Sequence, residues 1–210
     1  MRKIGMLTVV LLQIAVFSAS ADVISLEPDR DAFVCDCDPG ATNPFAGDQF
    51  LAQGRISSCY HRTFISWDLS SLPEDIEITD AEFRMYCAQR DGSPSGEMYY
   101  YRVLETWNEN TVTWGNKPEY TEDDGITLTE WPTANAWHTV DVTDFTINWY
   151  NETTDNYGLY CTAWLCTSIN DCLFYSSRVS VPAYRPKLVI TYTTGADLEA
   201  TTWGSVKATN

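Results

Sequence analysis

Apolar and polar residues alternate with a period of two along much of the chain. The clearest case is the segment 81–87, in which small or apolar residues at the odd positions alternate with Glu82, Arg84 and Tyr86. Such alternation is typical of a β-strand with one buried face. Further strands are expected at residues 64–69, 97–104, 140–142, 159–165 and 188–192, which are rich in aromatic and β-branched residues.

Turn-forming residues separate these segments, as at 38–40, 91–94, 116–118 and 124–125. One short helix is expected where Phe145 and Trp149 stand four positions apart, behind Thr143 or Asp144 as a capping residue. There is no strand–helix–strand alternation. The pattern therefore predicts an all-β domain, either a β-sandwich or a barrel.

The two ends of the chain differ from its middle. Arg2 and Lys3 precede a mostly apolar run, and small residues with an A-x-A site end at Ala21. This order is typical of a secretory signal peptide, here residues 1–21, and the apolar run is shorter than the roughly 20 residues of a membrane span. The folded domain is expected at 22–192. Residues 193–210 are small and polar, and we interpret them as a C-terminal tail.

Charge narrows the range of partners. The chain has 13 basic and 29 acidic residues and a net charge of −16. Such a charge repels phosphate, so we expect no nucleic-acid partner and no anionic membrane surface. Aromatic residues make up 13% of the chain, which is too many for a disordered protein. With the leader, this composition predicts a secreted or cell-surface domain.

The chain has seven cysteines, and all lie after residue 21. Disulfides are therefore expected after export. Cys166 and Cys172 flank a short polar loop, and a bridge between them would staple a hairpin. Cys59 with Cys35 or Cys37 is a second expected pair. Because seven is odd, at least one cysteine has no partner within the chain and is a candidate for an intermolecular disulfide.

Several segments occur in an order that resembles a known family. They are residues 62–73 (RTFISWDLSSLP) with 81–86, residues 107–118 (WNENTVTWGNKP), and residues 137–143 with 157–159, 176–178 and 185–192 (RPKLVITY). Together they resemble the DNRLRE domain, also called the disaggregatase-related repeat, over residues 24–192. The resemblance implies a jelly-roll-like antiparallel β-sandwich on an exported protein. Some such domains act as carbohydrate-binding modules, and one is described as binding alginate.

Aromatic residues are the first candidates for carbohydrate contacts. Tyr99 and Tyr101 share one face of an expected strand, and they make an outward pair if Tyr100 lies in the core. Sugar stacking and ordinary cross-strand packing both fit that pair. Trp107 and Trp114 lie in a matched segment, where they either form a stacking platform or belong to a loop that plugs the sandwich.

Basic residues are the second candidates. Arg62, Lys117 and Arg178 all lie in the matched segments. Together they are suited to hold a uronate carboxylate through charge-assisted hydrogen bonds, and the alternative is that each makes a structural ion pair. The negative net charge disfavours polyanions at long range, so a neutral glycan remains an equal candidate.

A calcium site is a further hypothesis. Asp29, Asp31, Asp36 and Asp38 lie close together in the sequence, and carboxylate oxygens are ligands that calcium prefers. Residues 36–40 match a fragment of a calcium-binding loop. No cofactor beyond this structural calcium is expected.

No motif indicates catalysis. The sequence has no G-x-S-x-G, H-E-x-x-H or P-loop motif, and His61 and His138 are not placed like a general base with an orienting partner. The sequence therefore predicts a secreted, non-catalytic module that binds an extracellular or cell-wall polysaccharide. The alternatives are a structural or adhesive domain of the cell surface and a diverged polysaccharide-degrading enzyme.

Overall fold

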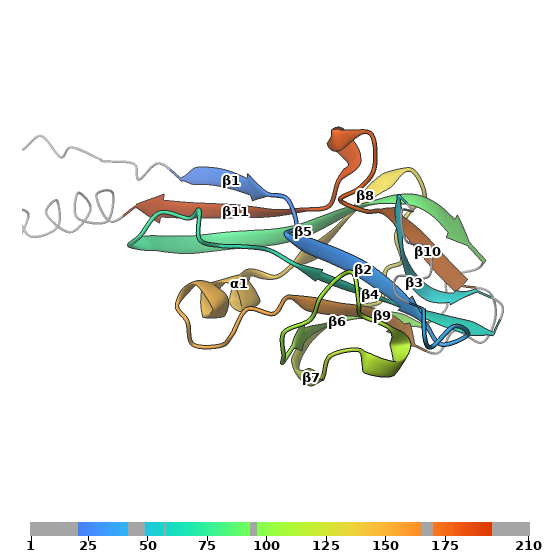
Figure 1. Cartoon of the computed structure of the whole chain (residues 1–210). Helices are drawn as coiled ribbons and strands as arrows, with labels where there is room; N and C mark the ends of the chain where they lie inside the picture. Colours follow the sequence, from blue (N-terminus) through green and yellow to red (C-terminus); the bar gives the residue numbers. More distant parts are fainter. Residues whose placement is uncertain (1–20, 42–48, 57, 93–95, 165–169, 195–210) are drawn as a thin grey trace, which may run out of the picture.

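One antiparallel sheet curls into two layers in the computed structural model of this chain (Figure 1). The structure describes residues 21–41, 49–56, 58–92, 96–164 and 170–194. The strands are β1 (Asp22–Leu26), β2 (Arg30–Cys35), β3 (Phe50–Ile56), β4 (Cys59–Ser66), β5 (Ile76–Asp91), β6 (Glu97–Val103), β7 (Tyr120–Leu128), β8 (Ala136–Asp141), β9 (Leu159–Trp164), β10 (Asn170–Tyr175) and β11 (Lys187–Thr194). This arrangement confirms the predicted all-β, jelly-roll-like sandwich.

Strand pairing defines the two layers. The order is β1-β11-β5-β10-β3-β4-β9-β6-β7, with β8 added to β5 and β2 added to β4. β3 pairs with β10 through its first residues and with β4 through its last ones, so it joins the two layers. The upper layer in Figure 1 contains β1, β11, β5, β8 and β10, and the lower layer contains β4, β9, β6 and β7.

The core lies between the layers and follows the predicted alternation. Phe83 and Met85 of β5 are fully buried, whereas Tyr86 is only half-buried. From the other layer, Ile65 of β4 and Leu159 of β9 join the same cluster of buried residues. Each apolar side chain of this size stabilises the fold by about 1.5–3 kcal/mol when it leaves water. The predicted strand at 81–87 is therefore confirmed, and it forms the middle of the longer strand β5.

The predicted helix is confirmed as α1 (Thr143–Tyr150), and its buried face includes Phe145 and Trp149. Its predicted cap is wrong, because the N-cap residue is Val142 and no side chain there accepts a hydrogen bond. The Asp141 carboxylate accepts from the backbone N–H of Thr143 at 3.0 Å. A residue just before the helix therefore satisfies one of the N–H groups that have no partner within the helix.

The segment that follows β6 folds back over the lower layer. Trp107 is buried, packs against Phe64 at 5.8 Å between ring centroids, and donates its indole N–H to the carbonyl of Tyr157 at 2.9 Å. It therefore serves as a plug rather than a stacking platform. Trp114 lies in η1 (Trp114–Asn116), a short 3-10 turn, and stays half-buried.

A disulfide joins Cys37 to Cys59 with a Cα–Cα distance of 5.3 Å, which confirms the second predicted pair and selects Cys37 over Cys35. Cys172 is a free, buried thiol in the structure, so the predicted Cys166–Cys172 staple finds no support. Cys166 itself lies outside the described residues. Cys172 approaches Cys87 of β5 instead, and a hydrogen bond between the two thiols lowers the pKa of Cys87.

The predicted signal peptide and C-terminal tail lie almost wholly outside the described residues, and both remain predictions. Strand β11 continues to Thr194, two residues beyond the expected end of the domain. In the part of the chain that the structure describes, no helix combines the length and the apolar character needed to cross a membrane.

Gly158 provides a test of the fold at the start of β9. Its φ is +86°, and an added Cβ would collide with the carbonyl oxygen of Ile65 and the backbone of Ser66. We expect Gly158→Ala to lower the free energy of unfolding by at least about 2 kcal/mol, since a side chain is disfavoured at positive φ and has no room there. Thermal melts should fall by roughly 4–8 °C. Gly40→Ala is the control, because nothing lies within 4 Å of its added Cβ.

His138 provides a pH-dependent test of the core. Its Nε2 lies 2.7 Å from the Tyr100 hydroxyl, and burial lowers the pKa of His138 to about 4. The unfolded chain binds this proton below about pH 6.5 and the folded chain only near pH 4, so the contribution of His138 to stability is present above pH 6.5 and lost towards pH 4.

We therefore expect wild type to lose up to about 3 kcal/mol more than His138→Gln between pH 7 and pH 4, measured by urea unfolding. The comparison with the variant removes the effect of Asp31 and Asp171, whose pKa values burial raises in both proteins. Parallel pH profiles for the two proteins would contradict this account.

Candidate functional site

The outer face of the lower layer carries a group of aromatic and basic side chains, which we name the tyrosine–cation surface. It brings together residues from β4, β6, β7 and β9 with the η1 segment. Its members are Tyr60, Arg62, Tyr99, Tyr101, Trp114, Lys117, Tyr120 and Tyr160. Four of the five residues that the sequence singled out for carbohydrate binding lie here.

Tyrosine rings form a continuous series across β6, β7 and β9. Tyr99 stacks on Tyr101 at 5.7 Å, Tyr101 on Tyr120 at 5.6 Å, and Tyr120 on Tyr160 at 4.1 Å between ring centroids. Tyr100 is fully buried on the other side of β6. The predicted outward pair is therefore confirmed, and alternation along the strand is its cause.

Gly125 makes room for this series. Strand β7 crosses over Tyr101, and a Cβ on Gly125 would collide with the Tyr101 ring. Tyr101 is consequently only 7% exposed, whereas Tyr99 and Tyr120 stay half-buried. The rings of Tyr99 and Tyr120 are therefore the part of the series that a ligand can reach.

Both cations lie against aromatic rings. Arg62 donates its Nε–H to the Tyr160 hydroxyl at 2.9 Å, and its guanidinium lies 5.2 Å from the Tyr60 ring and 5.7 Å from the Trp114 ring. Lys117 Nζ lies 4.8 Å from the Trp114 ring and donates to the Trp114 carbonyl at 3.2 Å. Cation–π contacts hold both groups in place at the edge of the tyrosine series.

The pKa values of the Tyr99 and Tyr160 hydroxyls are raised, so these two groups stay protonated at physiological pH. The hydrogen bond that Tyr99 donates to Glu97 raises the pKa of Tyr99 to about 12. Burial raises the pKa of Tyr160 to about 12, against the opposing effect of Arg62. Arg62 and Tyr160 are only 3% and 2% exposed, so the groups that this surface offers to a ligand are Lys117 and the half-buried rings of Tyr99, Tyr120 and Trp114.

Arg178 does not belong to this surface. Its guanidinium pairs with the carboxylates of Asp31 at 3.1 Å and Glu109 at 3.2 Å, and it donates to the Asp31 carbonyl at 2.9 Å. These bonds tie the segment after β10 to β2 and to the folded-over loop. Its contacts in the structure are thus those of the structural ion pair that the sequence left open as an alternative.

Three of the four aspartates of the calcium hypothesis accept hydrogen bonds from separate donors. Asp31 is buried and accepts from the Ser177 N–H and hydroxyl, Asp29 accepts from the Ser66 hydroxyl, and Asp36 accepts from the Tyr60 N–H. Burial raises the pKa of Asp31, although its bonds to Ser177 and Arg178 oppose the shift. Calcium binding by these residues stays a prediction.

Another group of side chains brings together atoms of the kind that bind metal ions. The sulfurs of Cys35, Cys37 and Cys59 and a carboxylate oxygen of Asp36 all lie within 4.8 Å of one another. Two of the three sulfurs form the disulfide, which removes them as metal ligands. In its oxidised form this group is therefore a covalent clip between the end of β2 and the start of β4.

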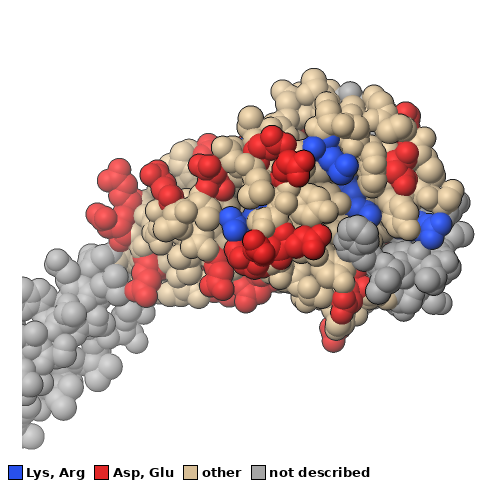
Figure 2. Space-filling model, turned by 90° about the horizontal axis from the view of Figure 1, so that it is seen from below, with Lys and Arg blue, Asp and Glu red and all other residues tan. Residues whose placement is uncertain are grey.

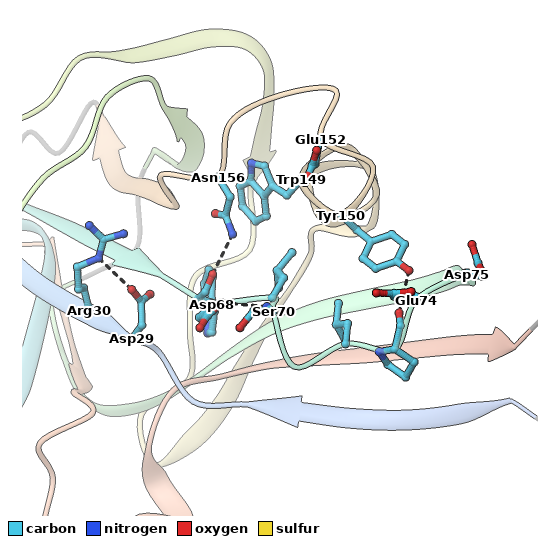
Figure 3. A pocket seen from close by; sticks show the side chains of 14 residues that line it. Asp29, Arg30, Asp68, Ser70, Glu74, Asp75, Trp149, Tyr150, Glu152 and Asn156 are labelled. Carbon is cyan, nitrogen blue, oxygen red and sulfur yellow. Dashed lines mark hydrogen bonds and ion pairs between the residues drawn. The ribbon is translucent and has the colours of Figure 1, made fainter.

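An open hollow of about 750 Å³ lies beside α1 (Figure 3). Asp68 and Ser70 form one side, Trp149 and Tyr150 face them from the helix, and Asn156 donates to the Trp67 carbonyl at 2.8 Å. The other labelled side chains are mostly carboxylates: Asp29, Glu74, Asp75 and Glu152, with Arg30 as the cation. So many carboxylates disfavour an anionic sugar in this hollow.

His61 lies near a carboxylate but beyond hydrogen-bond distance, so the expectation that neither histidine is placed like a general base with an orienting partner is not contradicted. Its Nδ1 lies 3.6 Å from an Asp171 oxygen. Gly54 pairs with both residues from the strand between them and has no side chain to separate them. Both side chains are almost completely buried, at 4% and 1% exposure, so they cannot contact a polymeric substrate in this conformation.

Figure 2 shows the face of the molecule that includes the lower layer. A short run of Lys and Arg crosses this face toward the end away from the chain termini, while Asp and Glu crowd the other end. Single cations also lie on either side of this run, which is the densest group of cations on this face. Local attraction of an anionic group is possible there in spite of the net charge of −16, because salt screens distant charges beyond about 10 Å.

Half-buried aromatic rings beside Lys117 on an outer sheet face are groups that can bind a ligand. The comparison with protein families agrees. The model of carbohydrate-binding module family 96 matches residues 22–192, and the chain belongs to this family. A search of the curated proteins found no match. The carbohydrate-binding kind of the predicted resemblance is confirmed, whereas the DNRLRE name stays a prediction.

Proposed function

We propose that this protein is a secreted, non-catalytic carbohydrate-binding module that holds a polysaccharide on the tyrosine–cation surface. The observation that carries the proposal is the contact of Lys117 and Arg62 with Trp114, beside the tyrosine series, in a chain of a carbohydrate-binding family. Export is part of the proposal. The Cys37–Cys59 disulfide supports it, since such bonds persist in oxidising compartments.

The chemistry of binding follows from the groups on the surface. Half-buried rings such as Tyr99, Tyr120 and Trp114 offer apolar area to the C–H faces of pyranose units. Lys117 offers N–H donors to a hydroxyl or carboxylate of the same chain. Glycoside hydrolysis uses a pair of carboxyl groups, whereas this surface presents rings and a cation, so the role that we propose for it is binding.

The competing interpretation as a surface domain held by intermolecular disulfides gains no support from the described cysteines. Cys35, Cys87, Cys161 and Cys172 are all buried as free thiols. A buried thiol cannot reach another chain without opening of the fold. That interpretation would therefore depend on Cys166, which lies outside the described residues.

Variants of the surface test the proposal by affinity electrophoresis in gels that contain a polyuronate or a neutral β-glucan. We expect Trp114→Ala and Lys117→Ala each to weaken retention about fivefold, through loss of a stacking or charge-assisted contact worth about 1 kcal/mol. If a carboxylate is the ligand group, only polyuronate retention should fall with added salt.

Arg185→Ala is the matched control for charge. Arg185 pairs with Glu27 on the exposed surface at 3.1 Å, so its removal costs the same charge without touching the tyrosine–cation surface. Retention that is equal in Trp114→Ala, Lys117→Ala and wild type, in folded samples, would reject this surface as the binding site. Release of reducing ends or unsaturated sugars from the gel polymer would reject the non-catalytic assignment.

A further inference from the structure

A second group of aromatic side chains lies on the outer face of the upper layer, and the proposed function makes no use of it. We name it the opposite aromatic row. Its rings come from β3, β5, β8 and β10, and from η2 (Pro182–Tyr184) before β11. They are Phe50, Tyr86, Trp137, Tyr175 and Tyr184.

The row runs across the strands. Trp137 pairs with Tyr86 in the β8–β5 register, and Tyr175 pairs with Phe50 in the β10–β3 register. The ring centroids are 5.5 Å apart for Trp137 and Tyr86, 5.9 Å for Tyr86 and Tyr175, and 5.3 Å for Tyr175 and Phe50. Since neighbouring strands lie about 4.8 Å apart, the row extends over about 14 Å.

Tyr184 adds a fifth ring beside the row. It lies 4.4 Å from Tyr86 and 5.4 Å from Tyr175 between centroids. The turn that carries it begins at Pro182 and stands out above the sheet (Figure 1). Tyr184 is therefore supplied by a connecting segment and covers the centre of the row from one side.

These rings are accessible. Trp137 is 38% exposed, Phe50 is 37% exposed, and the three tyrosines are half-buried. Centroid separations above 5 Å exceed the contact distance of about 3.5–4.0 Å, so neighbouring rings in the row overlap only in part. No hydroxyl of the three tyrosines hydrogen-bonds to another described residue, which leaves these groups to solvent or a ligand.

The surroundings of the row carry little net charge. Lys187 Nζ lies 4.5 Å from the Trp137 ring, and Arg84, its partner in the β11–β5 register, forms an ion pair with Glu82. Lys187 is thus fixed by an aromatic ring as Lys117 is on the other face. The row, however, lacks a second cation stacked on its rings among the contacts of the described residues.

Alternation places the two surfaces on opposite sides of the molecule. On β5, Met85 and Cys87 point into the core, so Tyr86 points out of the upper layer. On β6, Tyr100 points into the same core, so Tyr99 points out of the lower layer. A chain bound to one surface therefore cannot reach the other without passing around the sandwich.

We propose that the opposite aromatic row is a second binding surface, and that it takes a neutral polysaccharide chain laid across the strands. This inference rests on the proposed function for the class of ligand. Partly open rings suit the C–H faces of pyranose units, and three phenol hydroxyls without a hydrogen bond to any described residue suit their hydroxyl groups. An apolar protein partner would leave those hydroxyls without partners, which carries a free-energy penalty.

Two surfaces on opposite faces give the module a further property. A single molecule holds two chains at once, one on each side of the sandwich, and so links polysaccharides to each other. Binding of both sites to one polymer network raises the apparent affinity through effective concentration. The chain therefore acts as a cross-link in a glycan matrix.

Single-face variants test the inference in gels that contain a neutral β-glucan. We expect Trp137→Ala and Tyr184→Ala each to weaken retention about fivefold and the double variant to weaken it further, because each removes one stacking contact. Trp114→Ala, which alters only the tyrosine–cation surface, should keep the part of the retention that depends on the row. Val181→Ala is the control, since this exposed side chain precedes Tyr184 and lies outside the row.

The outcomes separate this inference from the proposed function. Loss of β-glucan retention in Trp137→Ala and Tyr184→Ala, with Val181→Ala unchanged and all variants equally stable, supports the row. Unchanged retention in these variants, while Trp114→Ala loses binding, rejects the row and leaves the proposed function intact. A wild-type dimer that Trp137→Ala converts to a monomer in size-exclusion chromatography also rejects it, because the row is then a contact between copies.

Discussion

The structure depends on one constraint, which is that neighbouring residues of a β-strand face opposite sides of the sheet. Three consecutive tyrosines show its effect most directly, because Tyr100 lies in the core while Tyr99 and Tyr101 stack on the outer face. The same rule puts Met85 inside and Tyr86 outside on β5. The chain therefore builds its main core between the layers and places aromatic residues on both outer faces, where the folded-over loop buries Tyr101 and Tyr160 in a second, smaller cluster.

The same pattern explains which parts of the fold could be predicted. The middle of β5 alternates cleanly and is predicted from that pattern, and β6 is predicted from its aromatic residues, whereas β7 is missed because residues 124–125 indicate a turn. In the structure Asp124 has a φ of +62° inside β7, where the register with β6 shifts, so the turn signal marks an irregularity within a strand. The disulfide was predicted only as a pair of alternatives, since spacing alone cannot choose between Cys35 and Cys37.

The sequence allows candidate residues to be chosen by residue type, but it does not show which of them the fold brings together. Arg62 and Lys117 are 55 positions apart in the sequence, and only the folded-over loop brings both to the Trp114 ring. Arg178 is of the same type, but buried Asp31 holds it elsewhere. Tyr120 and Tyr160 complete the series, and no local signal separates them from the other tyrosines of the chain. The opposite row needed the register of four strands to become visible.

A glycan-array screen of the whole, folded chain with its disulfide intact tests the central claim most directly. The account predicts binding to at least one class of polysaccharide, without any cleavage of the arrayed glycans. A blank array from a sample that circular dichroism shows to be folded would contradict the assignment of carbohydrate binding to this protein.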